Sequence, residues 1–149
     1  MTALDRTDRR ILAVLDEDPR RSTATVADTL GLARGTVHTR LERLKTLGLR
    51  PNSVRISPEM LGYATRAYVS LELSQGSLDR VVAHLQTIPE VIETVAISGR
   101  EDLMCQVLAT DNDHLYEIGQ RILAEPGVER SVTSIVLREH IAQRLGQLL

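Results

Sequence analysis

The spacing of the apolar residues changes along this 149-residue chain, and that change is the strongest constraint on its fold. Before residue 47 the apolar residues recur every three or four positions, as on one face of a helix. From Thr65 the spacing becomes two, as in a strand with one buried face, and helical spacing then returns twice. This pattern predicts a small helical domain followed by a separate α+β domain.

Three short helices are expected in the first part of the chain. The first has its apolar face around Ile11, and the second begins at Ser22, a residue type that caps helix N-termini, and ends at Gly31. The third is expected over residues 34–46, before Gly48 ends it. Two short helices joined by a glycine-containing turn are typical of a helix-turn-helix, whose second helix enters the major groove of DNA.

The third helix has a buried side and an outward side. Val37, Leu41 and Leu44 recur at spacings of four and three and define the buried side. The candidate DNA-binding residues lie on the outward side, on its flanks and at the N-terminal end of the helix. They are Arg34, Gly35, Thr36, His38, Thr39, Arg40 and Arg43. Arginine can contact phosphate or guanine, and Thr and His can contact base edges or phosphate. An ordinary surface helix carries similar residues, so the helix-turn-helix context is what favours DNA binding.

The charge divides in the same way as the pattern. The net charge of the chain is −2. Residues 1–57 contain 11 Lys and Arg against 7 Asp and Glu, a balance of +4, whereas the remaining residues contain 7 against 13, a balance of −6. A basic first part joined to an acidic remainder indicates that only the first part contacts phosphates.

We expect three divisions of the chain. Residues 1–50 form a winged helix-turn-helix, and residues 51–64 form the wing and linker, where Arg55 adds a candidate phosphate contact. The apolar spacing in residues 65–149 predicts the order βαββαβ, which is a ferredoxin-like arrangement. Its two halves share the pattern P-x-V-x-x-(T/S)-V, at residues 89–95 and 126–132. A final amphipathic helix, at residues 139–149, is expected to contact a partner subunit.

The composition favours association. Aromatic residues make up 2% of the chain, with no Phe or Trp, so the cores must be built from aliphatic side chains. Small domains of this kind often gain missing burial by oligomerising. Cys105 lies in an apolar stretch and is expected to be buried rather than reactive. No signal peptide or membrane-spanning stretch is evident, so a cytoplasmic protein is expected.

The connection at residues 98–102 is a candidate ligand site. An α-amino acid needs an acceptor for its ammonium, such as Asp102 or Glu101, and donors for its carboxylate, such as Arg100 or backbone N–H groups. Gly99 has no side chain and would let the backbone come close to such a ligand. The same residues also suit a plain hairpin in which Asp102 bonds its own backbone.

The motifs, in their order and spacing, resemble the Lrp/AsnC (leucine-responsive/asparagine regulator) family over nearly the whole chain. They are Leu4-Asp5 with Asp8, Ile11-Leu12, Val26-Ala27, Gly31-Leu32, Val37-x-x-Arg40-Leu41, Pro58-Glu59-x-Leu61-Gly62, Gly99-x-x-Asp102 and Pro126-Gly127-Val128. The resemblance implies a winged helix-turn-helix that binds double-stranded DNA, a ferredoxin-like effector domain, and homodimers that assemble further, commonly into octamers. It also implies an amino-acid-type effector between dimers.

For that effector the resemblance implies contacts from the loop and from the last strand: Ser98, Gly99, Arg100, Glu101, Asp102, Thr133, Ser134 and Ile135. Two departures from the family pattern stand out. Ala33 replaces the serine that usually caps the third helix, which removes a side-chain acceptor. Glu101 replaces a frequent aromatic residue, which favours a basic or small polar amino acid.

Two other functions share this architecture. Some relatives process tetrapyrroles, but the four histidines form no metal-ligand spacing, and no nucleophile or phosphate-loop motif is present. We therefore expect a regulator that is no enzyme and needs no metal or cofactor. A low-specificity architectural protein that wraps DNA would carry the same residues as a sequence-specific regulator, and only footprinting separates the two.

Overall fold

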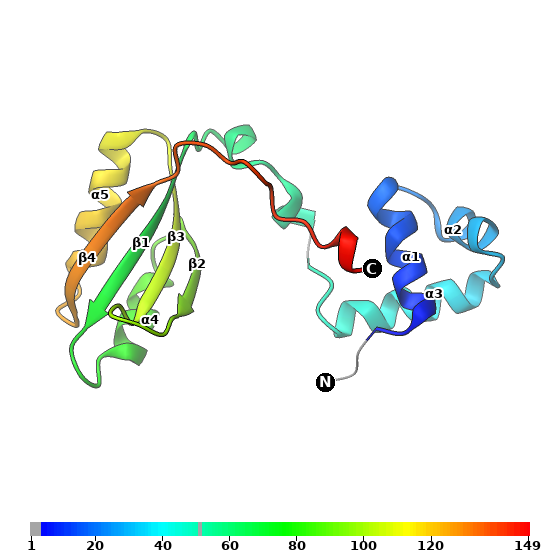
Figure 1. The fold of residues 1–149 in the computed structure, drawn as a ribbon, viewed down its shortest axis with the longest axis horizontal. Coiled ribbons are helices and arrows are strands. Elements are labelled where there is room, and N and C mark those ends of the chain that lie inside the picture. Colours follow the sequence, from blue (N-terminus) through cyan, green and yellow to red (C-terminus); the bar gives the residue numbers. More distant parts are fainter. Residues whose placement is uncertain (1–3, 51) are drawn as a thin grey trace. The chain divides into compact units, whose positions relative to one another are not determined.

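A computed structural model describes residues 4–50 and 52–149, so Pro51 of the expected linker lies outside the described residues. The chain divides into two compact units (Figure 1). The first, called here the N-terminal unit, comprises the residues up to Arg55 together with Ile141–Leu149. The second, the sheet unit, comprises Ile56–His140. The last nine residues were expected to belong with the second domain.

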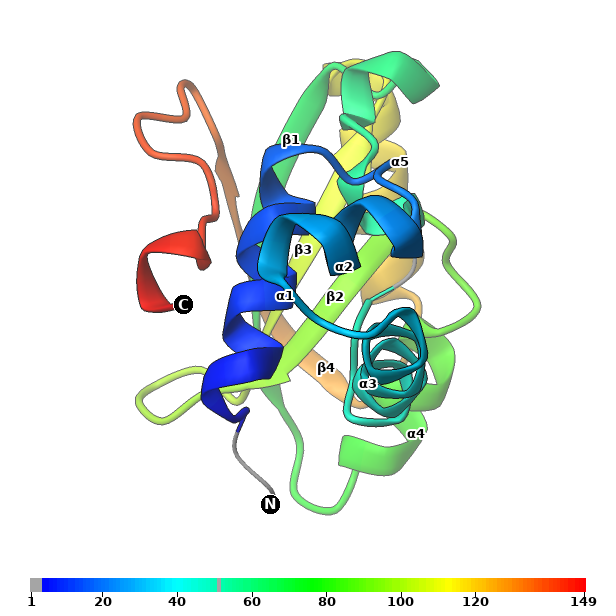
Figure 2. The same cartoon turned by 90° about the vertical axis from the view of Figure 1, so that its right-hand side faces the viewer.

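The N-terminal unit contains helices α1 (Arg6–Glu17), α2 (Thr23–Leu30) and α3 (Arg34–Thr46). Figure 2 looks nearly along α3 and shows the three helices crossing rather than lying parallel. Gly31 ends α2 in the left-handed conformation, at φ 64°, as the sequence predicts. The bounds of α3 match the prediction.

The core of the N-terminal unit is small. Five buried residues form it, contributed by all three helices: Ile11, Val14, Val26, Ala27 and Val37. Leu41 packs against this core, and Leu44 is buried. The predicted inward side of α3 is therefore confirmed, and the opposite side is left facing solvent.

The described residues of the segment expected to form the wing contain no strand. Residues Asn52–Arg55 form a 3₁₀ turn, and a second 3₁₀ turn follows at Pro58–Leu61. Within the part of the chain that the structure describes, no strand lies between α3 and residue 65. A short strand needs a neighbour to accept its backbone hydrogen bonds and a core to bury its side chains. Val54 and Ile56 have neither, since both are exposed.

The sheet unit is the predicted βαββαβ fold. Its four antiparallel strands have the order β2-β3-β1-β4 and are β1 (Thr65–Leu73), β2 (Val91–Ala96), β3 (Leu103–Ala109) and β4 (Val128–Ile135). Helices α4 (Leu78–Leu85) and α5 (Asn112–Leu123) lie on the same side of the sheet (Figures 1 and 2). The strands and helices match the expected order.

The core of the sheet unit lies between the sheet and these two helices. Ala67, Val69 and Leu71 alternate inward from β1 and meet Ile118 of α5 among fourteen buried residues. Cys105 belongs to the same core, as expected. Burial raises the pKa of its thiol, which keeps the sulfur protonated and unreactive.

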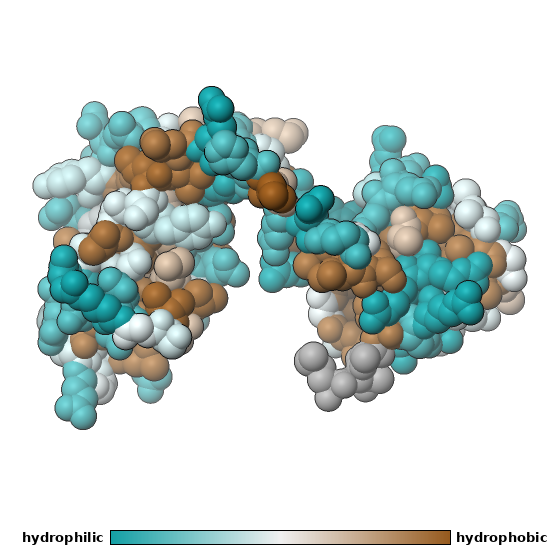
Figure 3. All heavy atoms as spheres, viewed as in Figure 1, coloured by the Kyte–Doolittle hydropathy of each residue, from teal (hydrophilic) through white to brown (hydrophobic). Residues whose placement is uncertain are grey.

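The opposite face of the sheet carries no helix. Tyr68, Val95 and Val132 lie on this open face and are all exposed. Figure 3 views the same side and shows apolar side chains among polar ones across it. An exposed mixed face of this kind is typical of a surface that another subunit covers.

The helix expected at residues 139–149 is wrong. The only helical turn there is the short 3₁₀ segment Gly146–Leu148. Gly146 lowers helix propensity in the middle of the segment, and the segment is too short to be stable as a helix by itself. Its end lies against α1, where the Arg9 Nη1 atom donates to the Leu148 carbonyl at 2.8 Å. No helix among residues 4–50 and 52–149 is both long and apolar enough to cross a membrane.

Candidate nucleic-acid interface and ligand pocket

The outward side of α3 presents a continuous polar surface, called here the recognition face. Five of the seven predicted residues on α3 are exposed: Arg34, Gly35, Thr36, His38 and Thr39. A groove of about 500 Å³ runs along the face and is lined by Asp5, Gly35, Thr36, Thr39, Arg40 and Arg43. The helical spacing of α3 thus brings together the residues that the sequence assigned to DNA.

The N-terminus of α3 also faces outward. Ala33 provides no side-chain cap, so the first N–H groups of α3 have no side-chain acceptor from the cap position. Beside this end lies a cleft of about 330 Å³ lined by Thr23, Arg34, Gly35 and His38. A helix N-terminus carries partial positive charge, and with Arg34 it suits a phosphate group.

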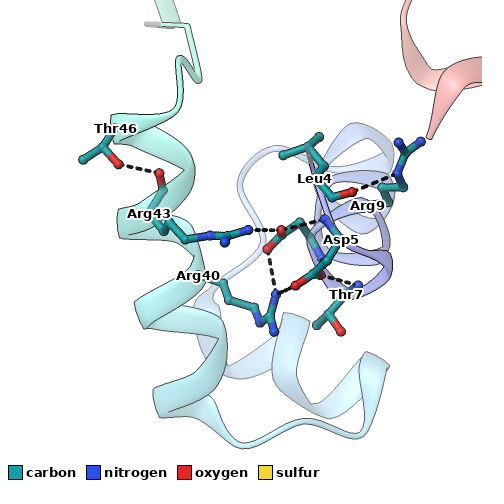
Figure 4. A network of polar contacts seen from close by, with 8 residues as sticks. Leu4, Asp5, Thr7, Arg9, Arg40, Arg43 and Thr46 are labelled. Atoms are coloured by element: carbon teal, nitrogen blue, oxygen red, sulfur yellow. Dashed lines mark hydrogen bonds and ion pairs between the residues drawn. The ribbon is translucent and has the colours of Figure 1, made fainter. Parts of the chain in front are cut away.

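The other two predicted residues, Arg40 and Arg43, are directed toward α1 (Figure 4). The Arg40 Nη1 atom lies 2.5 Å from Asp5 Oδ2 and 2.9 Å from Asp8 Oδ1, and the Arg43 Nη2 atom forms an ion pair with Asp8 Oδ2. Asp8 is fully buried, so its carboxylate needs these cations to offset its desolvation. Both arginines therefore serve a structural role beside any contact with DNA.

Asp5 and Asp8 also build the start of α1. Asp5 is its N-cap and accepts from the Thr7 and Asp8 N–H groups, while Asp8 Oδ2 accepts from the Asp5 N–H at 3.0 Å. The side-chain hydrogen bond from Arg40 lowers the pKa of Asp5 to about 2, and the same bond raises the pKa of Arg40. Both side chains therefore stay charged at neutral pH.

Arg55 ends the 3₁₀ turn that replaces the wing, and it is exposed. It remains available for the predicted phosphate contact.

A second candidate site lies in the sheet unit, where the β2–β3 connection meets the end of β1. The Asp102 Oδ2 atom accepts from the Leu73 N–H at 2.7 Å, and the Asp102 N–H donates to the Leu71 carbonyl at 2.8 Å. Asp102 thus anchors the β2–β3 connection to the end of β1 by two hydrogen bonds. Gly99 adopts a φ of 138°, as a hairpin of this kind requires. The plain hairpin expected from the sequence has Asp102 bonded to its own backbone, but the Asp102 side chain bonds the backbone of β1 instead.

A cavity of about 350 Å³ adjoins Asp102. Leu73, Ser74, Gln75, Gly76, Leu78, Ala96, Ile97 and Asp102 line it. Of the predicted loop residues, only Asp102 belongs to this lining, while Ser98, Gly99 and Arg100 are exposed and Glu101 is half-buried. The lining residues Ser74, Gln75 and Gly76 were not among the predicted site residues, although a polar, glycine-containing stretch directly after a strand could have indicated them.

The predicted residues of β4 lie away from this cavity. Ile135 pairs with Ala67 near the start of β1, whereas the loop that contains Asp102 meets β1 beyond Leu71. These two positions on β1, Ala67 and Leu71, are four residues apart along the strand, which corresponds to about 13 Å. Thr133 and Ile135 also alternate with Ser134 between the two faces of the sheet. Within one subunit, the structure does not bring the loop and β4 residues together.

Family models match both units. An AsnC-type helix-turn-helix domain matches residues 4–45, and an Lrp/AsnC ligand binding domain matches residues 66–145. The chain belongs to the Lrp/AsnC family. Among similar Lrp/AsnC-type proteins is the HTH-type transcriptional regulator FL11 of Pyrococcus abyssi, which is 30% identical over 139 residues, or 93% of this chain and 92% of that protein.

Solved structures agree with this assignment. AsnC of E. coli has a TM-score of 0.85 and 26% identity, with 97% of this chain and 99% of that one covered. The transcriptional regulator NMB0573 of Neisseria meningitidis, solved in complex with L-Met, has a TM-score of 0.84 and 26% identity, covering 99% and 100% of the two chains. This Lrp/AsnC chain is a DNA-binding transcription regulator with a ligand-binding domain.

Proposed function

We propose that this regulator reads specific operator sites with the recognition face of α3, and that an amino acid bound to the sheet unit alters how its dimers present that face. The observation that carries the proposal is the exposed row of donors on α3 beside an uncapped, outward N-terminus. Such a regulator acts where the chromosome lies, which places it in the cytoplasm of a bacterium or archaeon.

We assign different roles to different residues of the recognition face. Arg34, the first N–H groups of α3 and Arg55 bind phosphates and fix the position of the helix. Thr36 and Thr39 in the groove and His38 in the neighbouring cleft contact base edges. Arg40 and Arg43 keep some of their N–H donors, but their charges are offset by Asp5 and Asp8.

The test of the DNA contacts compares Arg34→Gln with Arg80→Gln, a charge-matched control in the sheet unit. Arg34→Gln should weaken binding to all sequences and lower the slope of log affinity against log salt by about one unit. Arg80→Gln should leave both unchanged. Equal behaviour of the two variants by fluorescence anisotropy would overturn the assignment.

We propose that the effector occupies the cavity beside Asp102. Apolar walls from Leu73, Leu78 and Ile97 suit an aliphatic stem, and the remaining Asp102 oxygen suits an ammonium. The L-Met complex of the Neisseria regulator supports an amino acid as the effector class. The preference for a basic or small polar amino acid, expected from Glu101, stays a prediction.

Calorimetry against the twenty amino acids tests this site. Asp102→Asn can still accept from the Leu73 N–H, so the loop should stay in place while the ammonium loses its counter-charge. We expect this variant to bind the effector at least tenfold more weakly, and we expect the matched control Asp113→Asn, at an exposed position on α5, to bind it within about twofold of the wild type. No binding tighter than millimolar, or equal binding by Asp102→Asn, would refute the site.

We also propose that the open face of the sheet pairs two subunits, and that the dimers assemble into a larger ring. Helices α4 and α5 cover one face only, and pairing with a second subunit would bury the exposed apolar residues of the other face. Because the loop and β4 residues do not meet within one subunit, a site that uses both sets would have to lie between subunits.

Light scattering tests the dimer. Val132→Asp on the open face should yield monomers at micromolar concentration, whereas Tyr116→Asp, on the exposed side of α5, should not change the mass. A wild-type monomer, or an unchanged assembly of Val132→Asp, would contradict the proposal.

A further inference from the structure

One lining residue of the recognition groove has the wrong charge for DNA. Asp5 borders the same groove as Thr36 and Thr39, and 47% of its side chain is exposed. Its carboxylate stays ionised because Arg40 lowers the pKa of Asp5 to about 2. A fixed negative charge on a DNA-facing surface repels phosphates and weakens binding that depends on phosphate contacts.

The two carboxylates of this cluster hold Arg40 differently. Asp8 is completely buried, and its bond to Arg40 is part of the packing between α1 and α3. Asp5 lies at the rim, where solvent or a ligand can reach both partners (Figure 4). Exposed ion pairs contribute little net free energy, because water competes for both charges. Arg40 can therefore exchange Asp5 for another anion without loss of its bond to Asp8.

We propose that Asp5 is a specificity-determining residue that competes with DNA for Arg40. On non-specific DNA, binding is loose and almost wholly electrostatic, so Arg40 stays on Asp5 and contributes no phosphate contact. At an operator, base contacts hold the groove tightly against the DNA, and Arg40 exchanges Asp5 for a phosphate or a guanine. Asp5 thereby lowers non-specific affinity more than specific affinity. This inference rests on the proposed function of α3.

The test uses Asp5→Asn in the full-length protein. Asn caps helices as well as Asp and has nearly the same size, so α1 should keep its start while Arg40 loses its competing charge. Asp28→Asn is the matched control, because it makes the same charge change at an exposed position on α2. Thermal unfolding checks that both variants fold.

We expect Asp5→Asn to raise affinity for non-specific DNA and to steepen its salt slope by about one unit beyond that of Asp28→Asn. The ratio of specific to non-specific affinity should fall about three- to tenfold. In the wild-type background, Arg40→Gln should leave the salt slope on non-specific DNA unchanged. In the Asp5→Asn background, the same substitution should lower that slope by about one unit. If Arg40→Gln does not fold, the first comparison decides alone.

Two results would overturn the inference: equal slopes and ratios for Asp5→Asn and Asp28→Asn, or a lower non-specific slope for Arg40→Gln in the wild-type background. Failure of the proposed function gives a different result, because the wild type would then show no preference for any site. A wild type that selects sites while Asp5→Asn keeps the same ratio refutes only the role of Asp5.

Discussion

Different interactions stabilise the two units of this regulator. The N-terminal unit has five buried core residues and adds a buried carboxylate, Asp8, held by two arginines. The sheet unit has fourteen buried core residues, and its one buried polar residue is the neutral Ser77. The first unit therefore depends on ion pairs for its helix geometry, whereas the second depends on apolar packing.

This difference extends to function. The candidate DNA-binding residues of α3 lie on one local surface, and their arrangement follows from the period of a single helix. The candidate ligand residues come from several strands and turns, and part of the predicted set meets only if another subunit contributes. The candidate DNA-binding residues thus depend on one helix, whereas the candidate ligand residues depend on the pairing of several strands.

The largest expected effect comes from the buried charge. Asp8→Ala removes the acceptor of both arginines and one half of the capping box of α1. We expect a loss of about 3 kcal/mol in the free energy of unfolding, near the lower end for a broken buried ion pair because Arg43 is partly exposed. Chemical denaturation measures it. A loss below about 1 kcal/mol would show that the N-terminal unit does not depend on this network.

The second prediction concerns side-chain packing in the sheet unit, where Gly127 lies in close contact with α4 and the residue before it. A Cβ at Gly127 would lie 2.6 Å from Ser77 Cβ and 2.8 Å from Val81 Cγ2, so Gly127→Ala should destabilise the sheet unit by about 2 kcal/mol. Gly119, in the middle of α5, has no atom within 4 Å of such a Cβ. Gly119→Ala should therefore stabilise the unit by up to about 1 kcal/mol. Shifts of the same sign in thermal unfolding would contradict this account of the core.

How far the sequence predicts the structure differs between the two units for physical reasons. The bounds of α3 and the order of the strands and helices in the sheet unit follow from local periodicity and match the structure. The partners of Arg40 and Arg43 lie more than thirty residues away, at Asp5 and Asp8, and no local pattern indicates them. The cavity beside Asp102 depends on the pairing of β1 with β3, which brings the turn after β1 to the β2–β3 connection.

The errors have the same origin. A wing within residues 51–64 and a helix at residues 139–149 both fit the local sequence, but each needs a neighbour to bury its apolar side. In the described residues these segments form 3₁₀ turns and irregular chain instead.

The smallest expected effect concerns pH. The pKa of Asp5 is about 2 in the folded chain, below its ordinary value of 3.8, so the ionised form stabilises the N-terminal unit. That contribution is complete above about pH 4 and is lost as the pH falls toward 2. The stability advantage of the wild type over Asp5→Asn should therefore shrink between pH 4 and pH 2.5 in thermal unfolding. A constant difference across this range would mean that the Asp5–Arg40 pair does not form in solution.

The central claim is that the recognition face of α3 reads base edges, and selection of bound sequences from a random DNA pool tests it most directly. The full-length wild type should enrich one motif made of two half-sites, as a symmetric dimer requires. Thr39→Val should change the preferred base at the same position in both half-sites and leave the spacing between them unchanged, because the assembly is set by the sheet unit. An identical motif from Thr39→Val and the wild type, or no motif from either, would contradict the claim.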